Sequence, residues 1–240
     1  GEKTEKTINY YPDGNIKSEH TVVSNYIQND NSIISEKTVE YDQDGNVKSS
    51  TELVYNKEGK LLYTLCKTLF PNNKLVEHCK YPSGNIVVIP AGQKATFADD
   101  GSVEIVQEDV LGCSLGGVSR TQPYIAITKK YDSEGNYTGY TEKGHNNRGF
   151  AAVHWENNYD KDNKIVNSSF TTSNGTVINL PENTFVQRYY GIYFTQRVCT
   201  PEGYLCVETA TDNGDNTITY NYYHPVTGEI IKSKTKPKKD

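Results

Sequence analysis

The sequence predicts an all-β protein in which repeated antiparallel β-hairpins form an extended or curled meander sheet. A short turn motif recurs along the chain, and the segments between its copies are half apolar and rich in β-branched residues and Tyr. No segment shows a sustained 3.6-residue period with capping signals. The 19 Tyr and 19 Gly agree with this class, because Tyr covers partly wet sheet faces and Gly closes tight turns.

The turn motif is an aromatic residue, two or three turn formers, Gly, then Asn or Lys, then an aliphatic residue. Proline presets φ at the first central position, Asp, Ser or Glu tolerates the second, and Gly takes the left-handed position that closes the hairpin. The last two copies are degenerate. In chain order the copies occupy residues 11–16, 41–47, 55–61, 70–75, 81–86, 97–103, 131–137, 200–205 and 224–230.

The segments after the turns have the composition of strands. Residues 15–22 and 46–53 are half apolar, and turns recur about 11–17 residues apart where the copies are dense. Such short periods indicate hairpins that each bury one face against their neighbours. Beyond residue 123 the turns are farther apart and the strands more aromatic, as at 150–155 and 188–194.

Two of these segments resemble known bacterial repeats. Tyr-Asp-Gln-Asp-Gly-Asn-Val at 41–47, with the same opening at 131–136, resembles the YD repeats of Rhs-type surface and toxin-shell proteins. Residues 10–19 are equally similar to the variant MORN repeats of bacterial exported and antitoxin-like proteins. The Gly-Arg step of YD repeats and the Trp and second Gly of MORN units are missing. The resemblance implies bacterial origin and a β-hairpin array, and it carries over no catalytic residue.

A small-residue break over 110–123 predicts two parts. Residues 1–110 form a β-hairpin repeat region, and residues 111–240 form a second β-rich half. We favour one continuous β-structure with two halves, because long twisted sheets curl, split or close. A separate second subdomain is the alternative.

Composition excludes several classes of protein. No stretch approaches the ~20 apolar residues of a membrane helix, so no membrane span is expected. The net charge of −5 argues against a nucleic-acid partner, which would call for a basic stripe. The basic segment 232–240 is interpreted as a solvated tail. The chain opens on Gly1 rather than Met, as a trimmed or processed chain would, and shows no n-region or apolar h-region of a signal peptide, so export cannot be read from this end.

The five cysteines allow two hairpin disulfides, Cys66–Cys79 and Cys199–Cys206, with Cys113 left over. Two-residue turns would set each pair face to face at disulfide range. A three-residue loop with a bulge would slip the register by one and point the partners to opposite faces, and the turn residues favour that geometry. Five buried, reduced cysteines are a further alternative.

The densest polar cluster is the candidate ligand-binding site: His145, Arg148, His154, Trp155 and Glu156. Trp155 would be the platform and Arg148 the polar anchor of a ligand cleft. On a strand, His154 and Glu156 face one side and Trp155 the other. No further His or Cys stands at a metal-ligating spacing, so neither a metal nor a cofactor is expected. A loop followed by a structural edge strand is the competing interpretation.

No catalytic residue is predicted. Gly112-Cys113-Ser114-Leu115-Gly116 matches the nucleophile elbow of serine hydrolases, but residues 117–123 cannot form the helix that this motif needs. The Asp-rich segment 212–216 lacks the distant Glu of a calcium loop and is interpreted as a turn.

The sequence therefore predicts an exported bacterial β-repeat protein that acts as a non-enzymatic binding or surface-interaction module. It would be a monomer, secreted or on the cell surface, with a lipoprotein as one form, and its partner would be a protein or a glycan. A hydrolase with a site near His145–Glu156 or Ser114 is one alternative. An antitoxin-like or shell-like module that holds a partner polypeptide is another.

Overall fold

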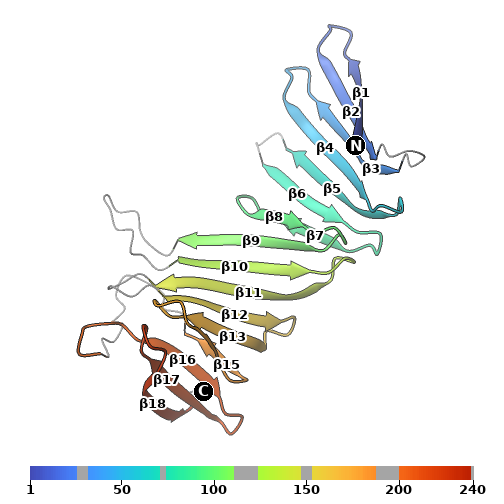
Figure 1. Cartoon of the computed structure of the whole chain (residues 1–240). Coiled ribbons are helices and arrows are strands. Elements are labelled where there is room, and N and C mark those ends of the chain that lie inside the picture. The colour runs from blue at the N-terminus through green and yellow to red at the C-terminus, as the bar shows by residue number, and fades with distance from the viewer. Residues whose placement is uncertain (26–31, 71–73, 111–123, 147–152, 188–199, 239–240) are drawn as a thin grey trace. The chain divides into compact units, whose positions relative to one another are not determined.

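A computed structural model describes residues 1–25, 32–70, 74–110, 124–146, 153–187 and 200–238. These residues form hairpin-linked antiparallel strands in three sheets and contain no helix, which confirms the predicted all-β class (Figure 1). The strands are β1 (Glu2–Tyr10), β2 (Ile16–Asn25), β3 (Ile33–Tyr41), β4 (Val47–Tyr55), β5 (Leu61–Leu69), β6 (Leu75–Lys80), β7 (Ile86–Ile89), β8 (Lys94–Phe97), β9 (Val103–Val110), β10 (Tyr124–Tyr131), β11 (Tyr137–Asn146), β12 (Val153–Asp160), β13 (Ile165–Thr171), β14 (Val177–Asn179), β15 (Thr184–Val186), β16 (Val207–Asp212), β17 (Thr217–Tyr223) and β18 (Ile230–Pro237).

Each sheet is a meander, because strands that are neighbours in the sequence are neighbours in space. The strand orders are β1 to β7 in the first sheet, β14 back to β8 in the second, and β15 to β18 in the third. The chain divides into two compact units, Gly1–Ile105 with Lys130–Tyr137, and Val106–Lys129 with Thr138–Asp240. In the part of the chain that the structure describes, no helix is long and apolar enough to cross a membrane.

The hairpin turns have the geometry that the motif predicts. The turn glycines at positions 14, 45, 59, 84, 101 and 135 all have positive φ, between 77° and 93°. In the first turn, Gly14 N donates to Tyr11 O at 3.0 Å and Tyr11 N donates to Asn15 O at 2.7 Å. The pairing register shifts by one residue beside this turn, so each such hairpin is a type I turn closed by a glycine bulge.

The structure contains two further copies of the turn motif that were not predicted. Residues 159–165, Tyr-Asp-Lys-Asp-Asn-Lys-Ile, form the turn between β12 and β13, and residues 171–177 form the turn between β13 and β14. In the first of them Asn163 replaces the glycine and adopts a φ of 61°. The signal was present, since Asn is the residue after Gly that best tolerates this conformation.

Side chains at the turns hold the backbone in place. Where the turn begins with Asp, the carboxylate accepts backbone N–H groups: Asp42 Oδ1 accepts from Asn46 N at 2.8 Å. Asp132 Oδ1 accepts from Asn136 N at 2.8 Å, and Asn56 makes equivalent bonds with its amide oxygen. Where the turn begins with Tyr or Ala, the side chain two residues later accepts the backbone N–H instead, as Asp13, Ser83 and Asp100 do. Hydrogen bonding thereby lowers the pKa of Asp42 and of Asp132.

These lowered pKa values predict acid sensitivity. A carboxyl whose pKa is lower in the folded chain than the ~3.9 of the unfolded chain contributes stability above that value and loses it as the pH falls through the folded pKa. We expect the thermal midpoint to drop between about pH 5 and pH 3. The variant Asp42→Asn/Asp132→Asn keeps both acceptor oxygens but removes the titrating carboxyls, as Asn56 shows for its own turn. The thermal midpoint of this variant should therefore fall less between about pH 5 and pH 3. Circular dichroism melts at each pH measure this, and an undiminished drop in the variant would contradict the explanation.

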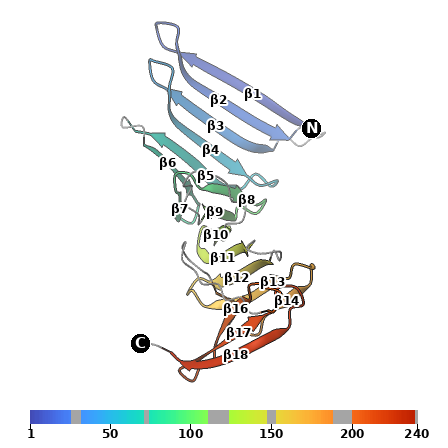
Figure 2. The ribbon, with the colours of Figure 1, turned by 90° about the vertical axis from the view of Figure 1, so that its left-hand side faces the viewer.

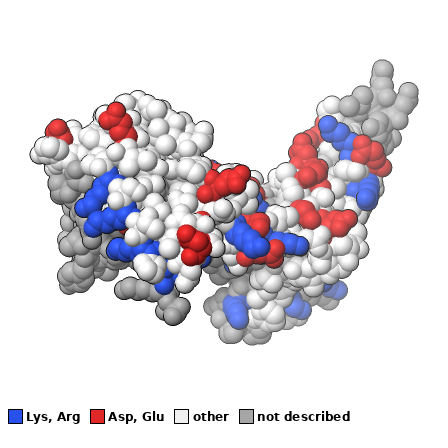
Figure 3. Space-filling view, turned by 90° about the horizontal axis from the view of Figure 1, so that it is seen from below, with Lys and Arg blue, Asp and Glu red and all other residues white. Residues whose placement is uncertain are grey.

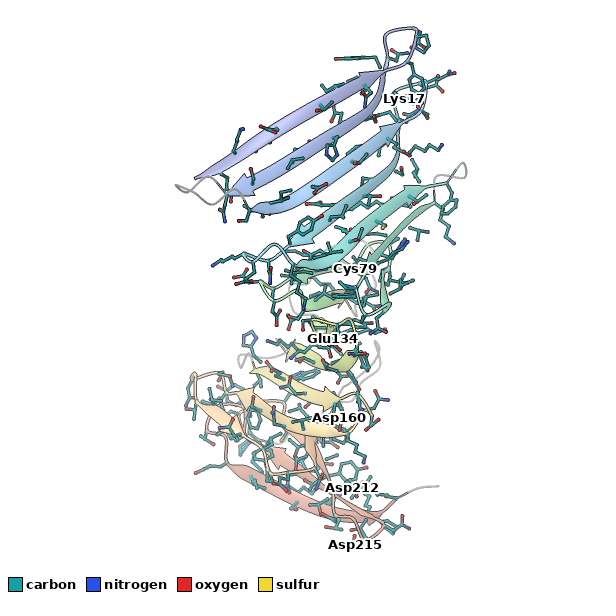
Figure 4. The ribbon with its side chains drawn as sticks, turned by 90° about the vertical axis from the view of Figure 1, so that its right-hand side faces the viewer. Lys17, Cys79, Glu134, Asp160, Asp212 and Asp215 are labelled. Carbon is teal, nitrogen blue, oxygen red and sulfur yellow. The ribbon has the colours of Figure 1, made fainter. Side chains whose placement is uncertain are left out.

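The core of the first unit lies over β5 to β7. Tyr63, Cys79, Tyr81 and Val87 are buried there with residues of β7 and β9. The hydroxyl of Tyr81 donates to the carbonyl of Gly101 at 3.0 Å. Cys79 lies in this core (Figure 4). Tyrosine thus supplies much of the apolar filling that Leu or Phe provides in other cores.

The strands β1 to β4 form a single layer at the other end of this unit (Figure 2). Most of their side chains are partly or fully exposed. Lys37 Nζ lies 3.9 Å from Glu52 Oε2 across β3 and β4, and similar pairs join other neighbouring strands. Opposite charges also adjoin on the face shown in Figure 3. Exposed pairs of this kind add at most ~1 kcal/mol each, so the single layer depends mainly on its backbone ladder.

The predicted disulfide Cys66–Cys79 does not form, because both thiols are free. Cys79 pairs with Leu65 and Cys66 pairs with His78, so the two sulfurs point to opposite faces of the sheet. This is the slipped register that the turn residues favoured. Burial raises the pKa of the Cys79 thiol to about 11, which keeps it protonated and unreactive at neutral pH.

The second predicted disulfide is only partly visible. Cys206 is disulfide-bonded. The pairing Cys199–Cys206 itself falls outside the described residues because Cys199 does, and so does Cys113.

Candidate functional site

The candidate site predicted from the sequence falls on two neighbouring strands of the second unit, β11 and β12. His154 pairs with His145, Trp155 with Gly144, and Glu156 with Lys143. Strand alternation places His154 and Glu156 on one face and Trp155 on the other, as predicted. Arg148 and the side chain of His145 lie outside the described residues. Of the five predicted residues, the structure brings His154, Trp155 and Glu156 together around one hollow.

We call the face that carries His154 and Glu156 the polar face. Glu156 Oε2 lies 3.0 Å from Lys143 Nζ, and Glu156 Oε1 accepts from Asn158 Nδ2 at 2.8 Å. The strand β13 contributes Ser169 opposite Glu156, and Thr171 opposite His154. These side chains line an open hollow of about 260 Å³, and Gly144 and Trp155 complete its lining. The hollow offers a cation, a carboxylate, an imidazole and two hydroxyls.

Trp155, the predicted platform, forms part of the lining of this hollow. Its indole packs with Phe170 and Val153 against the core of the second unit. A Cβ added to Gly144 would lie 2.4 Å from Cζ2 of the ring, so the ring covers the backbone of Gly144. Residues 154 and 155 point to opposite faces of the strand, so the indole packs toward the core while Trp155 still forms part of the lining of the hollow.

Buried polar side chains join the second and third sheets. Asn157 is fully buried, its Nδ2 donates to the carbonyl of Val186 at 2.9 Å, and its Oδ1 accepts from Val186 N at 2.8 Å. The hydroxyl of Ser168 donates to the carbonyl of Thr184. These bonds satisfy the backbone of β15, so β15 can lie over the face of β12 and β13 that faces the core. Nothing in the sequence marks these residues, because a buried Asn looks like any other polar residue of a strand.

A second and larger hollow, of about 530 Å³, lies in the same unit. We call it the end pocket. Its lining comes from the turn between β12 and β13, from β15 and the residue before it, from the turn between β16 and β17, and from the end of the chain. Figure 4 labels Asp160 and Asp212, the last residues of β12 and β16, on the same side of this unit. The lining includes Tyr159, Asn163, Asn183, Phe185, Asp212 and Lys238.

Charge in the end pocket is largely paired. Asp212 Oδ2 lies 2.8 Å from Lys238 Nζ, and Asp212 Oδ1 accepts from Gly214 N at 2.9 Å. The hydrogen bond from Lys238 holds the pKa of Asp212 below its usual value. Residues 212–216 were predicted to form a turn, and Asp212 caps the connection between β16 and β17 through its bond from Gly214 N. That this turn also lines a pocket depends on contacts with residues far away in the chain.

The described residues contain no candidate metal site, and the candidate hydrolase residue falls outside them. Within the described ranges, no three side chains of His, Cys, Asp or Glu gather as metal ligands would. Ser114 and its Gly-x-Ser-x-Gly segment fall outside those ranges. Comparison with known proteins adds no family, since no protein-family model and no curated protein sequence matches this chain.

Proposed function

We propose that this chain is an exported bacterial β-repeat protein that acts as a non-enzymatic binding module and presents the polar face of β11 to β13 to a protein or glycan partner. The observation that carries the proposal is the open hollow in which Lys143, His154, Glu156, Ser169 and Thr171 stand side by side on paired strands. The backbone ladder fixes the spacing of these side chains, and the bonds of Glu156 to Lys143 and Asn158 restrain two of the charged groups before a partner binds.

The contacts of Glu156 favour recognition over proton transfer. One carboxylate oxygen is paired with Lys143 and the other accepts a hydrogen bond from Asn158. Thr141 Oγ1 in turn donates to Asn158 Oδ1 at 2.6 Å. The network fixes the carboxylate and the ammonium as neighbouring acceptor and donor groups. A partner with complementary donors and acceptors can bind them without reorganising the sheet.

Two observations support export. The turn motif resembles repeats of bacterial surface and exported proteins, and Cys206 is disulfide-bonded, a state that persists outside the cytosol. Intact mass before and after reduction of protein purified without reductant tests this. We expect reduction to add the mass of two hydrogens per disulfide, and an unchanged mass would remove this support.

Protein and glycan arrays probed with the purified chain test the binding function. We expect a partner whose affinity falls about tenfold or more in Lys143→Ala/His154→Ala/Glu156→Ala, as for loss of several central polar contacts. The matched control Lys37→Ala/Glu52→Ala removes an exposed cross-strand pair of the first unit and should leave the affinity unchanged. Equal losses in both variants, or no partner on the arrays, would contradict the proposal.

A further inference from the structure

We infer that the end pocket is a second binding site, whose ligand is a neutral sugar unit of a glycan. Its volume of about 530 Å³ falls within the range of ~300–1,000 Å³ that small-molecule sites occupy. The site is separate from the polar face, because Tyr159 lies on the face of β12 opposite to that of Glu156. The inference goes beyond the proposed function and does not depend on it.

The aromatic part of the pocket is preorganised. Tyr159 and Phe185 are half-buried and both line the pocket. The ring of Tyr159 stacks on that of Tyr140, with centroids 4.4 Å apart and planes 8° apart, and its hydroxyl donates to Glu142 Oε2 at 3.4 Å. These contacts hold the ring in position before any ligand arrives. Aromatic rings present an electron-rich surface that suits the C–H face of a sugar ring.

The side-chain amides of Asn163 and Asn183, two residues with positive φ, complete the site. Only three described residues other than glycine have positive φ, and two of them, Asn163 (61°) and Asn183 (58°), line this pocket. Hydrogen bonds hold both backbones: Asn163 N donates to Asp160 O within its turn at 3.1 Å, and Asp212 N donates to Asn183 O at 3.0 Å beside the pairing of β15 with β16. No hydrogen bond to another described residue engages either side-chain amide. Each amide offers a donor and an acceptor, the pair that a sugar hydroxyl matches.

The choice of Asn at these positions is informative. Most other copies of the turn motif carry Gly there, which adopts positive φ without strain. Asn163 therefore keeps the turn and adds a carboxamide at the rim of the pocket.

The charges of the pocket favour a ligand without net charge. Asp212 and Lys238 neutralise each other at 2.8 Å, and Lys164, the remaining charged residue of the lining, is exposed to solvent. The pair of Asp212 and Lys238 offers an acceptor and a donor to two adjacent hydroxyl groups of a sugar, and because its charges cancel it does not attract an ionic ligand. Two aromatic rings, two amides and a paired charge together match a molecule with an apolar face and a rim of hydroxyls.

Substitution of the two Asn residues by Gly makes a clean test. Asn163→Gly/Asn183→Gly removes both amides while leaving in place a residue that adopts positive φ more easily, so the turns should be retained. The matched control is Asn216→Gly, because Asn216 has a φ of 65° and does not line the pocket. The probes are glucose, galactose, mannose and N-acetylglucosamine as neutral sugars, and glucuronic acid as an anionic one. Saturation-transfer NMR with the full chain detects binding, and titration gives Kd.

We expect at least one neutral sugar to bind the chain, with Kd raised about tenfold or more in Asn163→Gly/Asn183→Gly and unchanged in Asn216→Gly. Binding should persist in Lys143→Ala/His154→Ala/Glu156→Ala, which separates this site from the polar face. If the double variant does not fold, Phe185→Leu removes one aromatic ring and should also raise Kd. Binding of none of the neutral sugars, binding of glucuronic acid alone, or equal losses in the variant and its control would overturn the inference.

Discussion

Replacement of Gly139 by alanine is expected to destabilise the second unit by about 3 kcal/mol or more. Gly139 has a φ of 140° and pairs with Asp160, and a Cβ added to it would lie 2.1 Å from the carbonyl oxygen of Tyr159. The obstructing atom belongs to the backbone of the paired strand, so no side-chain rotation can relieve the clash. The ladder between β11 and β12 would have to open.

Urea denaturation followed by fluorescence measures this loss, since Trp155 is the chain's only tryptophan and lies in the affected unit. Gly175→Ala is the matched control, because Gly175 also has positive φ (88°) but has nothing within 4 Å of the added Cβ. Its cost should be limited to backbone strain, about 1–2 kcal/mol. Similar costs for the two variants would show that the close approach at Gly139 is not a constraint.

Phe170→Ala is expected to cost the second unit about 3–5 kcal/mol, the usual loss for a buried phenylalanine. Phe170 is only 1% exposed, and it packs edge-on against Tyr223 with ring centroids 5.2 Å apart. It also pairs with Trp155 across β12 and β13. Its removal leaves a cavity beside the indole, so the emission of Trp155 should shift to longer wavelength as water gains access.

Val166→Ala serves as the control for this prediction. Val166 lies on the same strand, β13, but is 58% exposed, so its truncation should change the free energy of unfolding by no more than about 0.5 kcal/mol. Urea denaturation compares the two variants directly. If Phe170→Ala cost no more than Val166→Ala, the cluster around Phe170 would not be the core of this unit.

Turn chemistry explains how much of the fold could be predicted. The glycines at positions 14, 45, 59, 84, 101 and 135 were recognised because left-handed φ is a local requirement that Gly meets in any context. The copy at 159–165 was missed because Asn163 occupies that position and no proline marks the turn. The slipped register of Cys66 and Cys79 could be anticipated from the same turn geometry.

The candidate site was predicted only in part. Alternation along β12 correctly separated His154 and Glu156 from Trp155. The sequence could not show that Trp155 would join the core, because that depends on Phe170 and on residues of the third sheet that pack against the same face. Nor could it show that Lys143 would pair with Glu156, which depends on the register between two strands.

The sequence by itself determined the all-β class and the positions of most hairpins, because both depend on the φ preferences of a few adjacent residues. Only the tertiary structure decided which faces are buried and where the pockets lie. The end pocket combines Tyr159, Phe185, Asp212 and Lys238, which are far apart in the chain and meet only after the third sheet packs on the second. Side-chain packing and strand register bring such residues together, and neither can be predicted from any one segment of the chain alone.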